Sequence, residues 1–154
     1  MNSELVKTIF ARAGTQTFAC AESFTGGKIA DAFVSVAGAS LFFKGGIVAY
    51  ETALKTKILG VPAELIEQFS VFSEPVARAM AEQVAKLCGT TCGIGTTGVA
   101  GPDDQDGVPA GTVFIAVKTP AGTFAQKLEI KNRSREAVRE IATRAALELL
   151  REHL

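Results

Sequence analysis

Ser23 has the residue type and the sequence neighbours of a catalytic nucleophile. The segment around it reads Ala21-Glu22-Ser23-Phe24-Thr25-Gly26-Gly27, and it lies between an apolar run and a helical pattern of apolar residues. This placement predicts a hydroxyl group at a strand-to-helix corner. Because Gly26 and Gly27 lack Cβ, the N–H groups from Thr25 to Gly27 are expected to approach a bound anion or a developing oxyanion. The alternative is that Ser23 only caps the helix.

Tyr50 and Lys55 are the candidates for activating Ser23. A serine hydroxyl is a poor nucleophile until a neighbouring group accepts its proton. A lysine can accept that proton if desolvation or a nearby cation lowers its pKa. Tyr50 ends a predicted strand and Lys55 lies in the following helix, so both side chains could point over one sheet edge, with Tyr50 relaying the proton or holding the lysine. The alternatives are a rim aromatic and a solvated helix charge.

Other catalytic and cofactor arrangements fit the sequence less well. The single histidine, His153, lies next to the C-terminal residue, which argues against a Ser-His-Asp triad. Cys88 and Cys92 are an isolated pair without companion ligands, so we predict no metal. Gly26-Gly27-Lys28-Ile29 lacks essential residues of a phosphate-binding P-loop, and the G-x-G-x-x-G match at 93–98 overlaps a strand with no helix after it.

Gly98, Ala100 and Gly101 lie in a loop expected at the same sheet edge, and together with Arg135 they are candidates for binding a ligand. The glycines lie in a loop rich in Gly, Pro and Asp that follows a predicted strand. Arg135 is expected near the N-terminus of the last helix, where a cation opposes the helix dipole unless an anion lies beside it. The alternatives are a turn-forming loop and a surface charge.

The hydrophobic pattern predicts about five strands and four or five helices, an α/β sandwich with mixed strand directions because one strand pair is a hairpin. If the first three strands are parallel neighbours, the loops after them meet at one edge of the sheet. The predicted strands are 17–21, a run ending near 50, 91–97, 112–117 and 123–130. The predicted helices are 3–14, 25–35 and 52–59, a further turn or two at 62–69, one helix that begins at Ser73 and one that begins at Ser134. Ser3 is the predicted N-cap of the first helix, and Ser134 caps the last helix, which is expected to contain a Glu140–Arg144 pair. In the helix from Ser73, the side chains expected to face the core are Val76, Met80, Val84 and Leu87.

Length and charge narrow the class of partner. The 154 residues suit one domain, and 16 basic against 16 acidic residues give no electrostatic sign of a nucleic-acid or membrane binder, so we expect a small-molecule partner.

The cysteine count and the N-terminal segment bear on the cellular location. Three cysteines are an odd number, which favours a reducing compartment. The N-terminus lacks the pattern of a secretory signal and no apolar run is long enough to span a membrane. We therefore expect a soluble cytoplasmic protein.

Several separated segments together resemble the motifs of one family, the C-terminal domain of the competence/damage-inducible protein CinA, whose stand-alone members include nicotinamide-nucleotide amidohydrolase (NMN deamidase). The resemblance covers nearly the whole chain. The matching segments are 21–27, Gly46-Ile47-Val48-Ala49-Tyr50 with Lys55, Val71-Phe72-Ser73-Glu74-Pro75-Val76-Ala77, Thr97-Gly98-Val99-Ala100-Gly101-Pro102 and Pro109-Ala110-Gly111-Thr112-Val113.

The resemblance implies a three-layer α/β/α sandwich on a mixed, mostly parallel sheet, and hydrolysis of the carboxamide of nicotinamide mononucleotide (NMN) to nicotinic acid mononucleotide and ammonia. It implies no metal or organic cofactor, and a homodimer or higher homo-oligomer. The family's catalytic serine, tyrosine and lysine correspond to Ser23, Tyr50 and Lys55, and its binding-site threonine and arginine to Thr97 and Arg135.

The chain departs from the family pattern at three places. Phe24 stands where cysteine is common, 70–74 replace Gly-Ala-Val-Ser-Glu, and the acidic run 103–106 replaces a glycine-rich continuation. These changes leave Ser23 and Lys55 in place but could reshape the pocket. Two alternatives to NMN deamidation therefore stay open: a nucleotide-binding regulatory module without useful turnover, and an amidohydrolase for another pyridine carboxamide.

Overall fold

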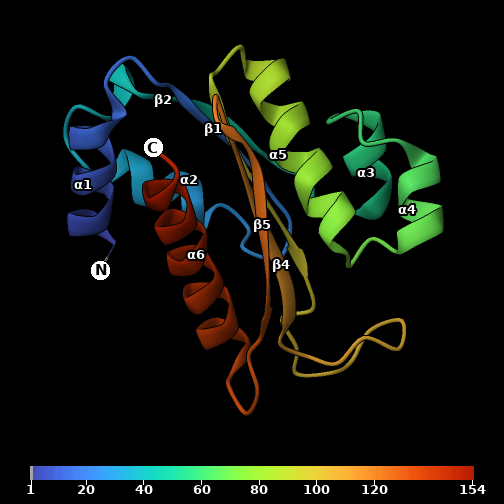
Figure 1. Ribbon diagram of the computed structural model, residues 1–154. Helices are drawn as coiled ribbons and strands as arrows, with labels where there is room; N and C mark the ends of the chain where they lie inside the picture. The colour runs from blue at the N-terminus through green and yellow to red at the C-terminus, as the bar shows by residue number, and fades with distance from the viewer. Residues whose placement is uncertain (1) are drawn as a thin grey trace.

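A five-stranded sheet lies between two layers of helices in the computed structural model, which describes residues 2–154 (Figure 1). The sheet order is β2-β1-β3-β4-β5. Helices α1, α2 and α6 cover one face and α3, α4 and α5 lie on the other (Figure 1). This confirms the three-layer α/β/α architecture. The strands are β1 Phe18–Glu22, β2 Phe43–Val48, β3 Cys92–Gly98, β4 Thr112–Thr119 and β5 Gly122–Glu129. The helices are α1 Ser3–Ala13, α2 Lys28–Val34, α3 Thr52–Lys57, α4 Ala63–Phe69, α5 Glu74–Cys88 and α6 Arg135–Glu152, with a 3-10 turn at Ala39–Leu41.

Strand direction brings three loops to the same edge of the sheet. Strand β1 pairs in parallel with β2 and β3, whereas β4 pairs antiparallel with both β3 and β5. Among the described strands, β4 is thus the one that runs against the other four. The chain leaves β1, β2 and β3 at their common carboxyl edge, which is where ligands bind in open α/β sheets. The predicted convergence of the loops after these strands is confirmed.

Glycines in β3 allow α5 to pack closely on the sheet. A Cβ atom at Gly93 would collide with the backbone oxygen of Ala81, and one at Gly95 would collide with that of Ala77. These glycines belong to the G-x-G-x-x-G match, so this part of the match is explained by helix–sheet packing. Strand β3 is buried along its whole length.

We expect Gly95→Ala to lower the free energy of unfolding by about 3 kcal/mol, because the added methyl group forces α5 away from the sheet. Urea denaturation followed by circular dichroism measures this change. An unchanged denaturation midpoint would contradict the close approach of α5 to β3.

Several local predictions were wrong. The structure has six α-helices among the described residues, more than the four or five expected, and α2 begins at Lys28 rather than at position 25. Helix α1 has Asn2, not Ser3, as its N-cap residue. Leu87 is 55% exposed, whereas Val76, Met80 and Val84 are buried as expected.

The predicted Glu140–Arg144 pair does not form. Glu140 instead binds Lys28, and Arg144 pairs with Glu148. The predicted side-chain cap of α6 is confirmed, since Ser134 Oγ accepts from the Ala137 N–H. None of the helices in residues 2–154 has the length and apolar character needed to cross a membrane.

Candidate functional site

Ser23 and Lys55 meet at the carboxyl edge of the sheet. Ser23 is the first residue after β1 and Lys55 lies in α3; the two residues are 6% and 1% exposed. The distance from Lys55 Nζ to Ser23 Oγ is 2.9 Å. The sequence predicted that these groups would come within reach of each other, and this contact is present.

The surroundings of Lys55 favour its neutral form. Its Nζ donates to the carbonyl oxygens of Ala49 at 2.8 Å and Tyr50 at 3.2 Å, and no acidic side chain in residues 2–154 pairs with it. Burial lowers the pKa of the Lys55 ammonium to about 8. When the amine is neutral, its two N–H bonds can donate to the two carbonyls, which leaves the lone pair free to accept the Ser23 proton.

Glu22 supports the segment 23–27 that carries the nucleophile, called the serine turn below, and its role was missed by the sequence reasoning. Its side chain is fully buried, and its carboxylate accepts hydrogen bonds from the N–H groups of Ile29 at 3.0 Å and Ala30 at 3.1 Å. Two of the free amides at the start of α2 are therefore satisfied by the protein itself. A charged residue directly at the end of an apolar strand is the signal that could have found it.

The structure does not bring Thr25, Gly26 and Gly27 to the cavity wall. Thr25 Oγ1 lies 2.9 Å from Thr96 Oγ1, and the Gly26 N–H donates to the Ser23 carbonyl at 3.1 Å. Gly26 and Gly27 have φ of 60° and 105°, so these positions need glycine for the shape of the turn. The interpretation of these residues as direct ligand contacts is therefore not supported by their placement.

Thr96 is a second residue that the sequence reasoning missed. It is fully buried in β3, and its Oγ1 accepts a hydrogen bond from the Ser23 N–H at 3.3 Å. It therefore links the serine turn to the neighbouring strand. A threonine in a glycine-rich buried strand gave no distinct signal, because such a side chain usually bonds to nearby backbone.

A cavity of about 420 Å³ opens beside Ser23 at the junction of the three loops. Gly98, Ala100 and Gly101 line it, as predicted, but Thr97 does not, because its hydroxyl donates to the Val71 carbonyl at 2.8 Å. The cavity is lined by Ser23, Phe24, Tyr50, Thr52, Lys55, Val71, Phe72, residues 98–105 and Arg135.

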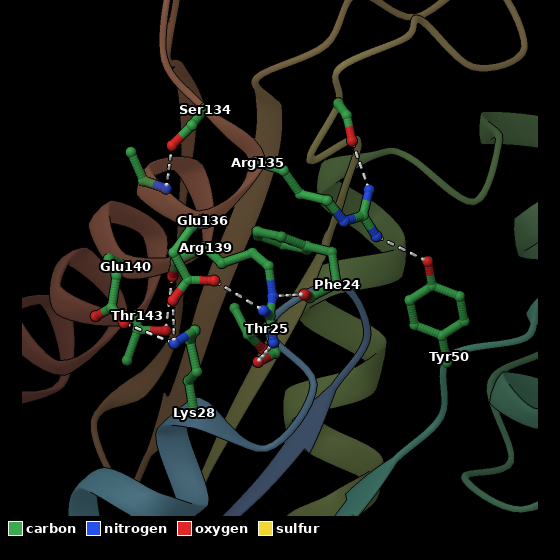
Figure 2. A network of polar contacts seen from close by, with 12 residues as sticks. Phe24, Thr25, Lys28, Tyr50, Ser134, Arg135, Glu136, Arg139, Glu140 and Thr143 are labelled. Atoms are coloured by element: carbon green, nitrogen blue, oxygen red, sulfur yellow. Dashed lines mark hydrogen bonds and ion pairs between the residues drawn. The ribbon is translucent and has the colours of Figure 1, made fainter.

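Arg135 and Tyr50 meet at the mouth of this cavity. Arg135 donates to the Gly101 carbonyl at 2.5 Å and to the Tyr50 hydroxyl at 3.1 Å, and Figure 2 shows the guanidinium beside the Tyr50 hydroxyl. Tyr50 is 60% exposed, and its hydroxyl bonds to Arg135 rather than to Lys55. Tyr50 therefore contacts Lys55 through its backbone carbonyl, and the side-chain relay expected from the sequence is absent from this arrangement.

Metal-binding side chains do not gather at this edge. Within residues 2–154, no group of three or more His, Cys, Asp or Glu side chains is close enough together to hold a metal ion.

Comparison with known proteins places the chain in a family. The family model of the CinA C-terminal domain matches residues 2–154. A CinA-like protein of Flavobacterium psychrophilum is 47% identical over 135 residues, which are 87% of this chain and 32% of that protein. The chain spans about a third of the length of the curated relatives it matches.

Solved structures agree with this assignment. A competence-damaged protein (CinA) superfamily protein from Escherichia coli superposes with a TM-score of 0.94 at 31% identity, covering 100% of this chain and 91% of that one. A CinA superfamily protein from Klebsiella pneumoniae gives a TM-score of 0.92 at 32% identity, covering 99% and 96% of the two chains. The chain therefore belongs to the CinA C-terminal domain family.

Proposed function

We propose that this protein is a nicotinamide-nucleotide amidohydrolase that converts NMN to nicotinic acid mononucleotide and ammonia. The observation that carries the proposal is the 2.9 Å contact between the buried Lys55 amine and the Ser23 hydroxyl, beside an open cavity. The substrate class comes from the sequence resemblance to NMN deamidases. Three free cysteines support a location in the reducing cytoplasm.

Lys55 would act as general base and then as general acid. The neutral amine takes the Ser23 proton as Oγ attacks the carboxamide carbon, and the resulting ammonium returns a proton to the departing ammonia. Water, activated by the same amine, then hydrolyses the acyl-serine and frees the carboxylate. The carbonyls of Ala49 and Tyr50 hold Nζ in place through both steps.

The Phe24 N–H is the strongest candidate for stabilising the tetrahedral oxyanion. Phe24 directly follows the nucleophile and lines the cavity. Among residues 2–154, no protein group accepts a hydrogen bond from this N–H, so it is free to bind an oxyanion. In this mechanism the Phe24 N–H takes the oxyanion-binding role that the sequence analysis assigned to the N–H groups of residues 25–27.

The cavity is large enough for a mononucleotide and carries a cation at its mouth. Its volume of about 420 Å³ lies in the usual range for small-molecule sites. Arg135 and the amides of Gly98 and Gly101 would hold the phosphate, which leaves the carboxamide end to reach Ser23.

The direct test is an ammonia-release assay of the purified chain with NMN, run beside nicotinamide and NAD. Release of ammonia from NMN but not from nicotinamide or NAD supports the proposal and shows that the site selects a mononucleotide. Release from a different pyridine carboxamide would reject NMN as the substrate. Saturable NMN binding without ammonia would instead identify a regulatory nucleotide-binding module.

We expect Tyr50→Phe to raise the KM for NMN about two- to tenfold and to change kcat by less than about threefold, because a single hydrogen bond to Arg135 is lost. The carbonyl that holds Lys55 remains. Steady-state kinetics measure both constants. A fall in kcat of about 100-fold or more would contradict this prediction and would indicate that the Tyr50 hydroxyl relays a proton in the reaction.

A further inference from the structure

Arg139 binds the backbone of the turn that carries the nucleophile. It follows Arg135 by one turn of α6, and its guanidinium donates to the Phe24 carbonyl at 2.8 Å and to the Thr25 carbonyl at 3.1 Å (Figure 2). One rigid planar group thus holds two successive carbonyls of the turn. A guanidinium is suited to this because its donors have fixed relative positions.

Charged neighbours hold Arg139 in this orientation. Glu136 accepts from Arg139 at 3.2 Å and from Lys28 at 2.9 Å, and Glu140 accepts from the same lysine at 2.6 Å. Figure 2 shows these side chains as one connected network between α6 and the start of α2. The serine turn leads directly into Lys28, so α6 is tied to the far end of the turn as well as to its middle.

The turn belongs to neither β1 nor α2, so its shape depends on side-chain contacts such as those of Thr96 and Arg139. Gly26 and Gly27 have left-handed backbone conformations, which leave this part of the chain with many accessible states when it is free. Arg139 is near enough that a Cβ at Gly26 would lie 3.0 Å from its Nη2. The carbonyl that Arg139 binds on Phe24 belongs to the same residue as the proposed oxyanion donor.

We propose that Arg139 is a positioning residue that keeps Ser23 Oγ and the Phe24 N–H aligned for attack on the carboxamide. This inference rests on the proposed role of Ser23 as nucleophile. Arg139 is not one of the described residues that line the cavity. Its loss should therefore act on the chemical step rather than on substrate binding, because misalignment costs rate even when the substrate is bound.

The test follows two reactions of the full chain: ammonia release from NMN, and covalent labelling by a fluorophosphonate measured by intact mass. In labelling, Ser23 Oγ bonds to phosphorus, fluoride leaves with the electrons of the P–F bond, and the serine proton passes to the base. We expect Arg139→Ala to lower both kcat and the labelling rate by about 10- to 100-fold, with KM within about twofold. Millimolar guanidinium should restore part of both rates.

Arg144→Ala is the matched control. This arginine lies on the same helix, 56% exposed, and pairs with Glu148 at 3.0 Å away from the site, so its loss should leave both rates unchanged. Melting temperatures of both variants check that they are folded. If Arg139→Ala does not fold, Arg139→Lys is used, and we expect the same fall in kcat and labelling with KM unchanged.

Two results would overturn the inference: a folded variant with wild-type kcat and labelling rate, or a variant in which KM alone changes. A wild-type chain that is labelled but releases no ammonia from NMN would reject the proposed substrate, and the labelling rates would still decide the role of Arg139. A wild-type chain that neither reacts with the fluorophosphonate nor turns over NMN would reject both proposals.

Discussion

Replacing Ser23 by alanine should abolish ammonia release, with a fall in kcat of on the order of 10⁴-fold or more. The reason is that Ser23 carries the hydroxyl held against the Lys55 amine within residues 2–154, and loss of a covalent nucleophile removes the route through an acyl-enzyme. The fold should persist, because the removed atom is a single oxygen whose neighbour Lys55 keeps two carbonyl acceptors. We expect the free energy of unfolding to change by less than about 1 kcal/mol.

Ser35→Ala is the control for this substitution. Ser35 Oγ donates to the Asp31 carbonyl at the exposed end of α2, away from the cavity, so the variant should keep full activity. Urea unfolding and fluorophosphonate labelling accompany the assay. Ammonia release by a folded Ser23→Ala protein at more than a tenth of the wild-type rate would exclude Ser23 as the nucleophile.

Replacing Lys55 by methionine should lower kcat/KM by about 10³-fold, the usual scale of general-base catalysis. Methionine keeps the length and apolar stem of the lysine but cannot accept a proton. In the wild-type chain, kcat/KM should rise with pH and level off above about 8, because burial lowers the pKa of Lys55 to that value and only the neutral amine is a base. The residual activity of the variant should not show this rise.

The same pKa makes a separate prediction about stability. Below pH 8 both the folded and unfolded chains hold the Lys55 proton, and above 10.5 neither does, so only the interval between these values matters. Within that interval the unfolded chain binds the proton that the folded chain has lost, so the free energy of unfolding should rise with pH. The rise attributable to Lys55 is roughly 3 kcal/mol at most.

The stability difference between the wild type and Lys55→Met isolates this effect from other titrating groups. Urea denaturation at several pH values from 7 to about 10.5 measures it, and we expect the wild type to gain on the variant as the pH rises. A difference that does not change with pH would mean that Lys55 has an ordinary pKa. Such a lysine would be a poor base near neutral pH.

Local sequence patterns predicted most elements of the fold but misplaced some of their ends. The apolar runs at β1 and β3 and the hairpin of β4 and β5 were found because burial of strands leaves a direct trace in residue type. The start of α2 was misplaced by three residues because two left-handed glycines extend the turn before it. Leu87 was assigned to the core from its spacing alone, yet its side chain lies in the last turn of α5 and is 55% exposed.

The candidate site was recovered in part. Ser23 and Lys55 were found from residue type and from resemblance, and their contact follows from parallel pairing of β1 and β2. Tyr50 was named from its place at a predicted strand end and Thr97 from the resemblance, but the direction of each side chain is set by its neighbours. The Thr97 hydroxyl donates to the Val71 carbonyl, and the Tyr50 hydroxyl bonds to Arg135 while the Tyr50 carbonyl holds Lys55.

By itself the sequence determined which chemical groups were available: a serine at a strand end, a lysine in the next helix, a single histidine at position 153, and an apolar pattern that requires a layered α/β domain. Only the tertiary structure decided which groups touch. Three such contacts depend on strand register and helix placement. Glu22 caps α2, the Tyr50 carbonyl accepts from Lys55, and Arg139 donates to the backbone of the serine turn. Such contacts depend on side-chain direction and on the packing of distant segments, which residue spacing along the chain does not encode.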